Sequence, residues 1–145
     1  HLPPVGTSDY VIVGAHYDHL GHGETGGFAR KDEEGKVHPG ADDNASGTAA
    51  MLELAGAISA QANAEKVTFR RGILFAAWSG EEVGLIGSSH FTEHSPLPLS
   101  NVVAYVNFDM VAFPCLCATA YHNREIRYNT RTIREDYEHH SHGNS

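Results

Sequence analysis

The chain has 145 residues, of which 41% are hydrophobic and 19% charged, a composition typical of one globular domain. Its formal net charge of -8 argues against nucleic acid as a partner. It contains no run of about 18 apolar residues, so we expect no membrane span.

The first third of the chain predicts a strand, a long loop and a helix. Residues 10–15 read YVIVGA, an apolar run typical of a buried strand. Residues 16–44 are rich in glycine, histidine and acid, and loops of this length inside a compact domain are usually functional. Residues 46–60 carry apolar side chains at spacings of three and four, which predicts an amphipathic helix. Its expected inner face is Met51, Leu54, Ala55 and Ile58, and its expected cap is Asp43, Asn44 or Ser46.

The middle of the chain predicts two more strands and a second helix. Residues 73–78 (ILFAAW) and 102–108 (VVAYVNF) read as buried strands. Between them we expect a helix that begins near Glu82 and runs towards His94, with Leu85, Ile86 and Phe91 on its inner face. Apolar strands that alternate with helices predict an α/β domain with a mostly parallel sheet.

Residues 112–145 differ from the rest of the chain. The acidic excess lies before them, because residues 1–111 contain 6 Lys and Arg but 14 Asp and Glu. Residues 124–145 have almost no apolar periodicity and end in a histidine-rich stretch, which predicts poor order. Cys115 and Cys117 are too close in sequence for an unstrained disulfide. We therefore divide the chain into a core, residues 1–111, and an atypical tail, residues 112–145.

Each predicted strand ends at potential metal ligands. The first strand runs into His16, the second into Glu81 and Glu82, and the third into Asp109. Asp43 lies where the long loop enters the first helix. Because the carboxyl ends of parallel strands meet at one edge of a sheet, we expect these side chains to converge there. Imidazole and carboxylate groups suit zinc, and an acid-rich set of this kind carries enough negative charge for two divalent cations.

Four motifs resemble those of the aminopeptidase S/aminopeptidase Y family of zinc peptidases. They read GAHYDHLG at residues 14–21, GADDNASG at 40–47, EEVGLIGS at 81–88 and NFDM at 107–110. They follow the family's order and have comparable spacing over about residues 8–111, which makes the resemblance highly specific. The resemblance implies a three-layer α/β sandwich and the hydrolysis of N-terminal peptide bonds in a peptide substrate.

The resemblance also implies a role for each matched side chain. The implied zinc ligands are His16 and Asp109 for one ion, Glu82 for the other, and Asp43 bridging both. Glu81 is the implied general base, which later donates a proton to the leaving amine. Asp18 is implied to orient the ring of His16.

One ligand of the family has no match in this chain, namely a histidine downstream of the Asp109 motif. We therefore expect the His16 site to be the tighter one, a zinc content nearer one ion than two, and little peptidase activity from residues 1–145 alone. A histidine of the tail could replace the missing ligand only at a cost in ordering entropy. His19, His22 and His38 are interpreted mainly as solvated loop residues, with contact to metal or substrate as the alternative.

Other interpretations of these residues stay open from the sequence. The His16–Asp18 pair could be structural, Asp43 could only cap a helix, and Glu81 with Glu82 could favour a helix dipole. The chain could also be a truncated, non-catalytic metal-binding module, or a relative of carboxypeptidase or glutaminyl cyclase type. The preferred N-terminal residue, the native metal and the oligomeric state are not indicated, and a secreted or periplasmic location follows from the resemblance only.

Overall fold

Four strands form one sheet in the computed structural model, which describes residues 6–23, 31–33, 35–65, 67–112 and 118–122. The strands are β1 (Tyr10–His16), β2 (Gly72–Trp78), β3 (Val102–Phe108) and β4 (Ala118–His122), in the spatial order β2-β1-β3-β4. The central strand β1 pairs in parallel with β2 and β3, whereas β4 is antiparallel to β3. The predicted mostly parallel sheet is therefore confirmed.

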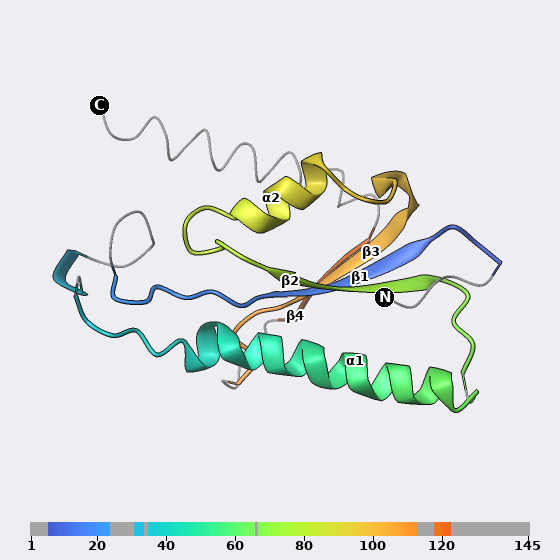
Figure 1. Ribbon diagram of the computed structural model, residues 1–145, viewed down its shortest axis with the longest axis horizontal. Helices are drawn as coiled ribbons and strands as arrows, with labels where there is room; N and C mark the ends of the chain where they lie inside the picture. Colours follow the sequence, from blue (N-terminus) through green and yellow to red (C-terminus); the bar gives the residue numbers. More distant parts are fainter. Residues whose placement is uncertain (1–5, 24–30, 34, 66, 113–117, 123–145) are drawn as a thin grey trace.

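Two helices cover opposite faces of this sheet. Figure 1 shows α1 (Gly47–Asn63) on one side of the strands and α2 (Ile86–Glu93) on the other. The crossover through α1 leads from β1 to its neighbour β2, and the crossover through α2 leads back past β1 to β3. The two crossovers thus run in opposite directions across the sheet. Because crossovers between parallel strands are right-handed, the two helices lie on opposite faces. The result is the expected three-layer α/β sandwich. Among the described residues, no helix is both long and apolar enough to cross a bilayer.

The face under α1 holds the apolar core. Val13, Ala15 and Met51 are buried there, and partly buried apolar side chains surround them. Leu54 is one of these, and Leu52 on the opposite side of the helix is exposed, which confirms the predicted inner face of the first helix for Met51 and Leu54. The surrounding side chains are Val11, Leu54, Ile73, Phe75 and Phe108.

The face under α2 is aromatic and partly polar. The ring of Trp78 packs against Phe91 of α2 at a centroid distance of 5.3 Å. Its indole N–H donates to the hydroxyl of Tyr105 (2.9 Å), which in turn donates to Asn107 (2.7 Å). A Cβ at Gly14 would lie 2.6 Å from the indole nitrogen, so glycine at this position of β1 is required by packing.

The second helix begins at Ile86, and the expected start near Glu82 is wrong. The backbone between them turns in the left-handed region, with φ of 106° at Gly84 and 58° at Leu85, which a right-handed helix excludes. The amides of Gly84 and Leu85 both donate to the carbonyl of Glu81 and close this turn. Ile86 is 58% exposed, so its expected place on the inner face is also wrong.

The sheet continues past Val111 through β4, which lies in the segment interpreted as the tail. The division of the chain at this residue stays a prediction. Cys115, Cys117 and residues 123–145, including the histidine-rich end, lie outside the described residues.

The side chain of Asn44 joins the ends of two strands to the start of α1. Asn44 is 1% exposed and lies in an irregular turn, Ala41–Ser46, before the helix. Its Nδ2 donates to the carbonyls of His16 (3.2 Å) and Phe108 (3.0 Å). Its Oδ1 accepts from the amides of Gly47 (3.1 Å) and Met110 (3.2 Å). Of the three expected caps, Asn44 is therefore the one that bonds the first amide of α1.

We expect Asn44→Asp to lower the free energy of unfolding by about 3 kcal/mol or more. The change replaces the donor of two buried carbonyls by an acceptor and buries a charge. The matched control is Asn63→Asp at the exposed end of α1, which should cost less than about 1 kcal/mol through the helix dipole. Urea unfolding of both variants measures this difference, and equal losses would contradict the role of Asn44.

Candidate metal centre

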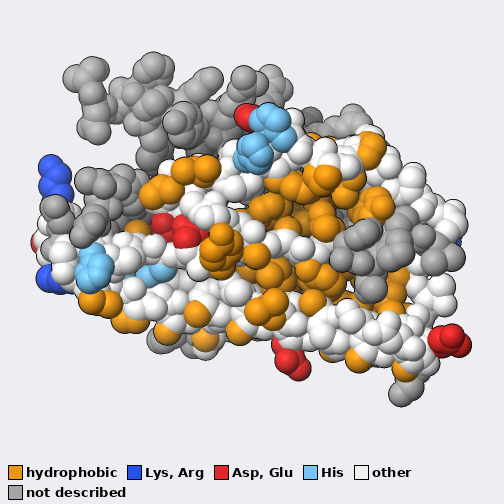
Figure 2. Space-filling model, viewed as in Figure 1, with side chains coloured by type: hydrophobic (Ala, Val, Ile, Leu, Met, Phe, Trp, Pro, Cys, Tyr) orange, Lys and Arg blue, Asp and Glu red, His pale blue; other side chains and the backbone are white. Residues whose placement is uncertain are grey.

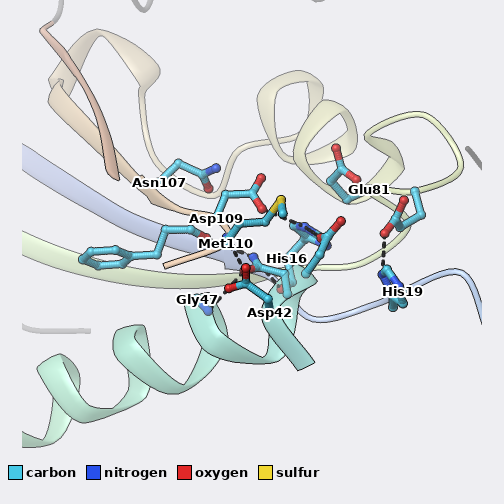
Figure 3. A network of polar contacts seen from close by, with 12 residues as sticks. His16, His19, Asp42, Gly47, Glu81, Asn107, Asp109 and Met110 are labelled. Carbon is cyan, nitrogen blue, oxygen red and sulfur yellow. Dashed lines mark hydrogen bonds and ion pairs between the residues drawn. The ribbon is translucent and has the colours of Figure 1, made fainter. Parts of the chain in front are cut away.

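The predicted site residues meet at the carboxyl edge of the parallel strands. His16 is the last residue of β1, Glu81 and Glu82 follow β2, and Asp109 follows β3. Asp43 comes from the turn that precedes α1. Figure 3 shows Asp109 and His16 close together, with Glu81 and His19 further along the same edge. Figure 2 shows a small group of acidic side chains with a histidine beside it, and other acidic side chains that lie apart from this group.

The first potential ligand group consists of His16, Asp43 and Asp109. Nε2 of His16 lies 3.1 Å from Oδ1 of Asp43 and 3.5 Å from Oδ1 of Asp109. The imidazole is almost fully buried, whereas the side chains of Asp43 and Asp109 are 36% and 38% exposed. One buried nitrogen therefore faces two carboxylates that remain accessible from solvent.

The second potential ligand group consists of His19, Asp43 and Glu82. Nδ1 of His19 lies 2.7 Å from Oε1 of Glu82, whose side chain is 7% exposed. In each group, the potential ligand atoms lie within 4.8 Å of one another, and Asp43 belongs to both groups. Imidazole nitrogen and carboxylate oxygen are zinc ligands, and a shared carboxylate fits a pair of neighbouring ions.

Three consecutive backbone amides hold Asp109 near Asp43. The amides of Met110, Val111 and Ala112 donate to side chains of the turn before α1. The acceptors are Asn44, Ser46 and Asp42, at 3.2, 3.0 and 3.0 Å. The peptide bond between Asp43 and Asn44 in this turn is cis. The segment after β3 is thus fixed to the turn that carries the shared aspartate.

Asp18 binds the turn that carries Glu81 and Glu82. Its Oδ1 accepts from the amide of Glu81 (3.1 Å) and its Oδ2 from the amide of Glu82 (3.2 Å). Nδ1 of His16 lies 3.2 Å from the backbone carbonyl of Asp18 and 3.8 Å from its carboxylate. Asp18 therefore contacts the His16 ring mainly through its backbone, while its carboxylate positions the two glutamates.

The crowding of carboxylates affects their protonation. Burial raises the pKa of Glu81, with His16 opposing the shift and the charges of Glu82, Asp109 and Asp43 adding to it. Burial also raises the pKa of Asp109, again opposed by His16 and increased by Asp43. Each added negative charge at this edge disfavours the next one, so a bound divalent cation would favour the ionised forms.

Comparison with known proteins identifies the family. The model of Peptidase family M28 matches residues 1–140. This chain belongs to peptidase family M28. The expected relationship to zinc-dependent aminopeptidases is thereby confirmed at the level of the family.

Similar M28 sequences are named as aminopeptidases. An aminopeptidase of Pseudomonas aeruginosa is 35% identical over 108 residues, which cover 74% of this chain and 16% of that protein. Aminopeptidase NAALADL1 of Mus musculus is 37% identical over 105 residues, which cover 72% of this chain and 12% of that protein. Aminopeptidase YwaD of Bacillus subtilis is 36% identical over 104 residues, or 71% of this chain and 18% of that protein. The chain thus spans less than a fifth of the length of these relatives. No solved structure matches it significantly.

The potential ligand group around Glu82 in this M28 chain contains His19, for which the sequence left contact to metal only as the alternative. His19 was interpreted mainly as a solvated loop histidine, yet the structure brings it against Glu82 across 63 positions of sequence. The feature of the sequence that indicated a role for His19 was its place in the GAHYDHLG motif, only three residues after His16. His22, from the same loop, is exposed and belongs to neither described group.

We expect Asp18→Ala to increase the hydrogen exchange of the Glu81 and Glu82 amides by roughly 10–100-fold, because hydrogen bonds to a charged acceptor contribute about 1.5–3 kcal/mol. The control is Asp32→Ala, an exposed residue of the short turn Lys31–Glu33, which should leave both amides unchanged. Amide exchange followed by NMR measures the effect. Unchanged protection of both amides in Asp18→Ala would show that the carboxylate does not hold this turn.

Proposed function

We propose that this chain carries the metal centre and the general base of an aminopeptidase, which hydrolyses the N-terminal peptide bond of a peptide substrate. The observation that carries the proposal is the pair of His/carboxylate groups that share Asp43, with Glu81 beside them. Membership of a peptidase family and the names of the relatives support the same reaction class.

The chemistry of the donor groups fits zinc. His16, Asp43 and Asp109 would hold one ion, and Glu82 with Asp43 would hold a second. When bound, zinc supplies a Lewis acid that favours the deprotonation of water and stabilises negative charge on a carbonyl oxygen. The exposure of Asp43 and Asp109 leaves this side of the centre open to substrate and water.

Glu81 is proposed as the residue that moves the proton. Among the described residues, it lies in neither ligand group, although it is electrostatically coupled to His16, Glu82, Asp109 and Asp43. Its half-buried carboxylate, with a raised pKa, suits a base that accepts a proton from the attacking water and returns it to the leaving amine.

Asp43 should be necessary for metal binding, since it belongs to both ligand groups. After removal of metal by chelator, zinc should stabilise the wild-type chain by roughly 2.7 kcal/mol at a free concentration of 100 times Kd. Asp43→Asn should lose most of this stabilisation. Asp42→Asn is the matched control, because its Oδ1 can still accept from Ser46 and Ala112 and it lies in neither group. Thermal unfolding with and without zinc tests this, and equal responses of the two variants would contradict it.

Glu81→Gln and Glu82→Gln should separate the base from the ligand. Glu81→Gln should keep zinc affinity and lower turnover by roughly 10²–10⁴, the usual contribution of a general base. Glu82→Gln should weaken zinc binding as well. Equal loss of zinc in both variants would refute this division of roles.

Turnover is best measured in a chimera, because the chain covers only 18% of a relative such as YwaD. Residues 7–111 would replace the matched segment of that enzyme, with leucyl anilide and N-acetyl-leucyl anilide as substrates. An aminopeptidase cleaves only the substrate with the free amine, and chelator abolishes the reaction. A folded chimera that binds zinc but hydrolyses neither substrate would favour a non-catalytic metal-binding module, whereas cleavage at the C-terminus of peptides would indicate a carboxypeptidase.

A further inference from the structure

Two histidines lie together at the end of α2, outside the candidate metal centre. Residues 90–94 read HFTEH, and His90 and His94 are both exposed. Their imidazole rings are stacked, with a centroid distance of 4.4 Å and an interplanar angle of 21°. Residues four positions apart in a helix are neighbours on one face, so this contact follows from the spacing. Neither histidine belongs to the two ligand groups found among the described residues.

The pair lies at the end of α2 that points away from the candidate metal centre. The turn with Glu81 and Glu82 precedes α2, whereas His90 lies in its last turn and His94 follows its last residue. α2 leads from the carboxyl end of β2 back towards the amino end of β3 (Figure 1). An ion bound by the pair would therefore be separate from any ion at the carboxyl edge of the sheet.

The carbonyl of His90 fixes the ring of His94. It accepts from the amide of His94 (2.9 Å) and lies 3.3 Å from its Nδ1. A carbonyl only accepts hydrogen bonds, so Nδ1 carries the proton in the neutral ring. Nε2 of His94 then keeps its lone pair, which is the state of an imidazole that binds a metal ion.

The end of the helix favours a cation. The carbonyl groups of a last helical turn give it a partial negative charge. The carboxylate of Glu93, an exposed residue, adds a negative charge to the same turn. Imidazole nitrogen suits divalent transition metal ions, whereas Mg²⁺ and Ca²⁺ prefer oxygen ligands. The pair thus combines suitable ligand atoms with a favourable local charge.

We propose that His90 and His94 form a separate metal site, which binds a divalent transition metal ion such as Zn²⁺ through one nitrogen of each ring. Two histidines four positions apart on one helix face are a known zinc-binding arrangement. With zinc–nitrogen bonds of about 2.0–2.1 Å and tetrahedral angles, the two nitrogens lie about 3.3 Å apart. Because both residues are exposed, rotation of their side chains can bring the stacked rings to this separation. Water completes the coordination, so the ion exchanges readily. The inference does not depend on the proposed function.

The alternative interpretation is that the two rings only stack, and that each binds zinc independently as an exposed histidine would. His90→Gln and His94→Gln separate the two interpretations, because each variant removes the pair but keeps one histidine. Two linked ligands hold an ion roughly 10²–10⁴ times more tightly than either does alone. His22→Gln is the matched control, since His22 is an exposed histidine of the loop after β1.

The test uses the 145-residue chain, labelled with ¹⁵N and titrated with zinc at about pH 7.5, because protons compete with the ion for imidazole. We expect the ring signals of His90 and His94 to shift together at one zinc concentration, with Nε2 of His94 as the bound atom. In each single variant, the remaining histidine should respond only at zinc concentrations roughly 100-fold higher or more. His22→Gln should leave the response of the pair unchanged, and Mg²⁺ should produce none.

Three results would overturn the proposal. The first is that the two rings respond at different zinc concentrations, and the second is that the remaining ring of a single variant responds as in the wild type. The third is that zinc shifts histidines such as His16 but neither ring of the pair, which would leave the proposed function intact. If one of the two variants does not fold, the other decides, because either substitution removes the pair.

Discussion

The side-chain amide of Asn44 is the contact on which the geometry of the centre depends. Its two donors and its acceptor oxygen bond four backbone groups, which belong to the end of β1, the end of β3, the start of α1 and the segment after β3. Asp43 precedes this anchor in the chain, and one of the bonded carbonyls is that of His16 itself. A buried amide with all these bonds satisfied tolerates little displacement, so the histidine and the shared aspartate are held together before any ligand binds.

A second constraint is the repulsion among the acids at this edge. Asp18 and Asp42 direct their oxygens to backbone amides. Asp43 and Asp109 instead face the imidazole of His16, and Glu82 faces that of His19. The acids therefore fall into two groups: one accepts hydrogen bonds from backbone amides, and the other faces histidine side chains. Burial is the main cause of the raised pKa values of Glu81 and Asp109, and the neighbouring carboxylates add to the shift.

The sequence predicted the strands well because each is a short apolar run, and β3 at Val102–Phe108 matches its prediction residue for residue. It also predicted the convergence of His16, Glu82 and Asp109, which follows from parallel topology alone. The start of α2 was wrong because acidic residues suggested a first turn, while Gly84 and Leu85 adopt left-handed backbone angles. The contact of His19 with Glu82 was not predictable by periodicity, since it joins two irregular segments and depends on the packing of Gly40.

The two ligand groups differ in what holds them. His16 is the last residue of a central strand, fixed by the sheet and by bonds to its carbonyl from Asn44 and Thr48. His19 lies beyond the strand, where its position depends on a closed loop and on Glu82 itself. The first group is therefore preorganised by the fold, whereas the second is held by contacts between its own members.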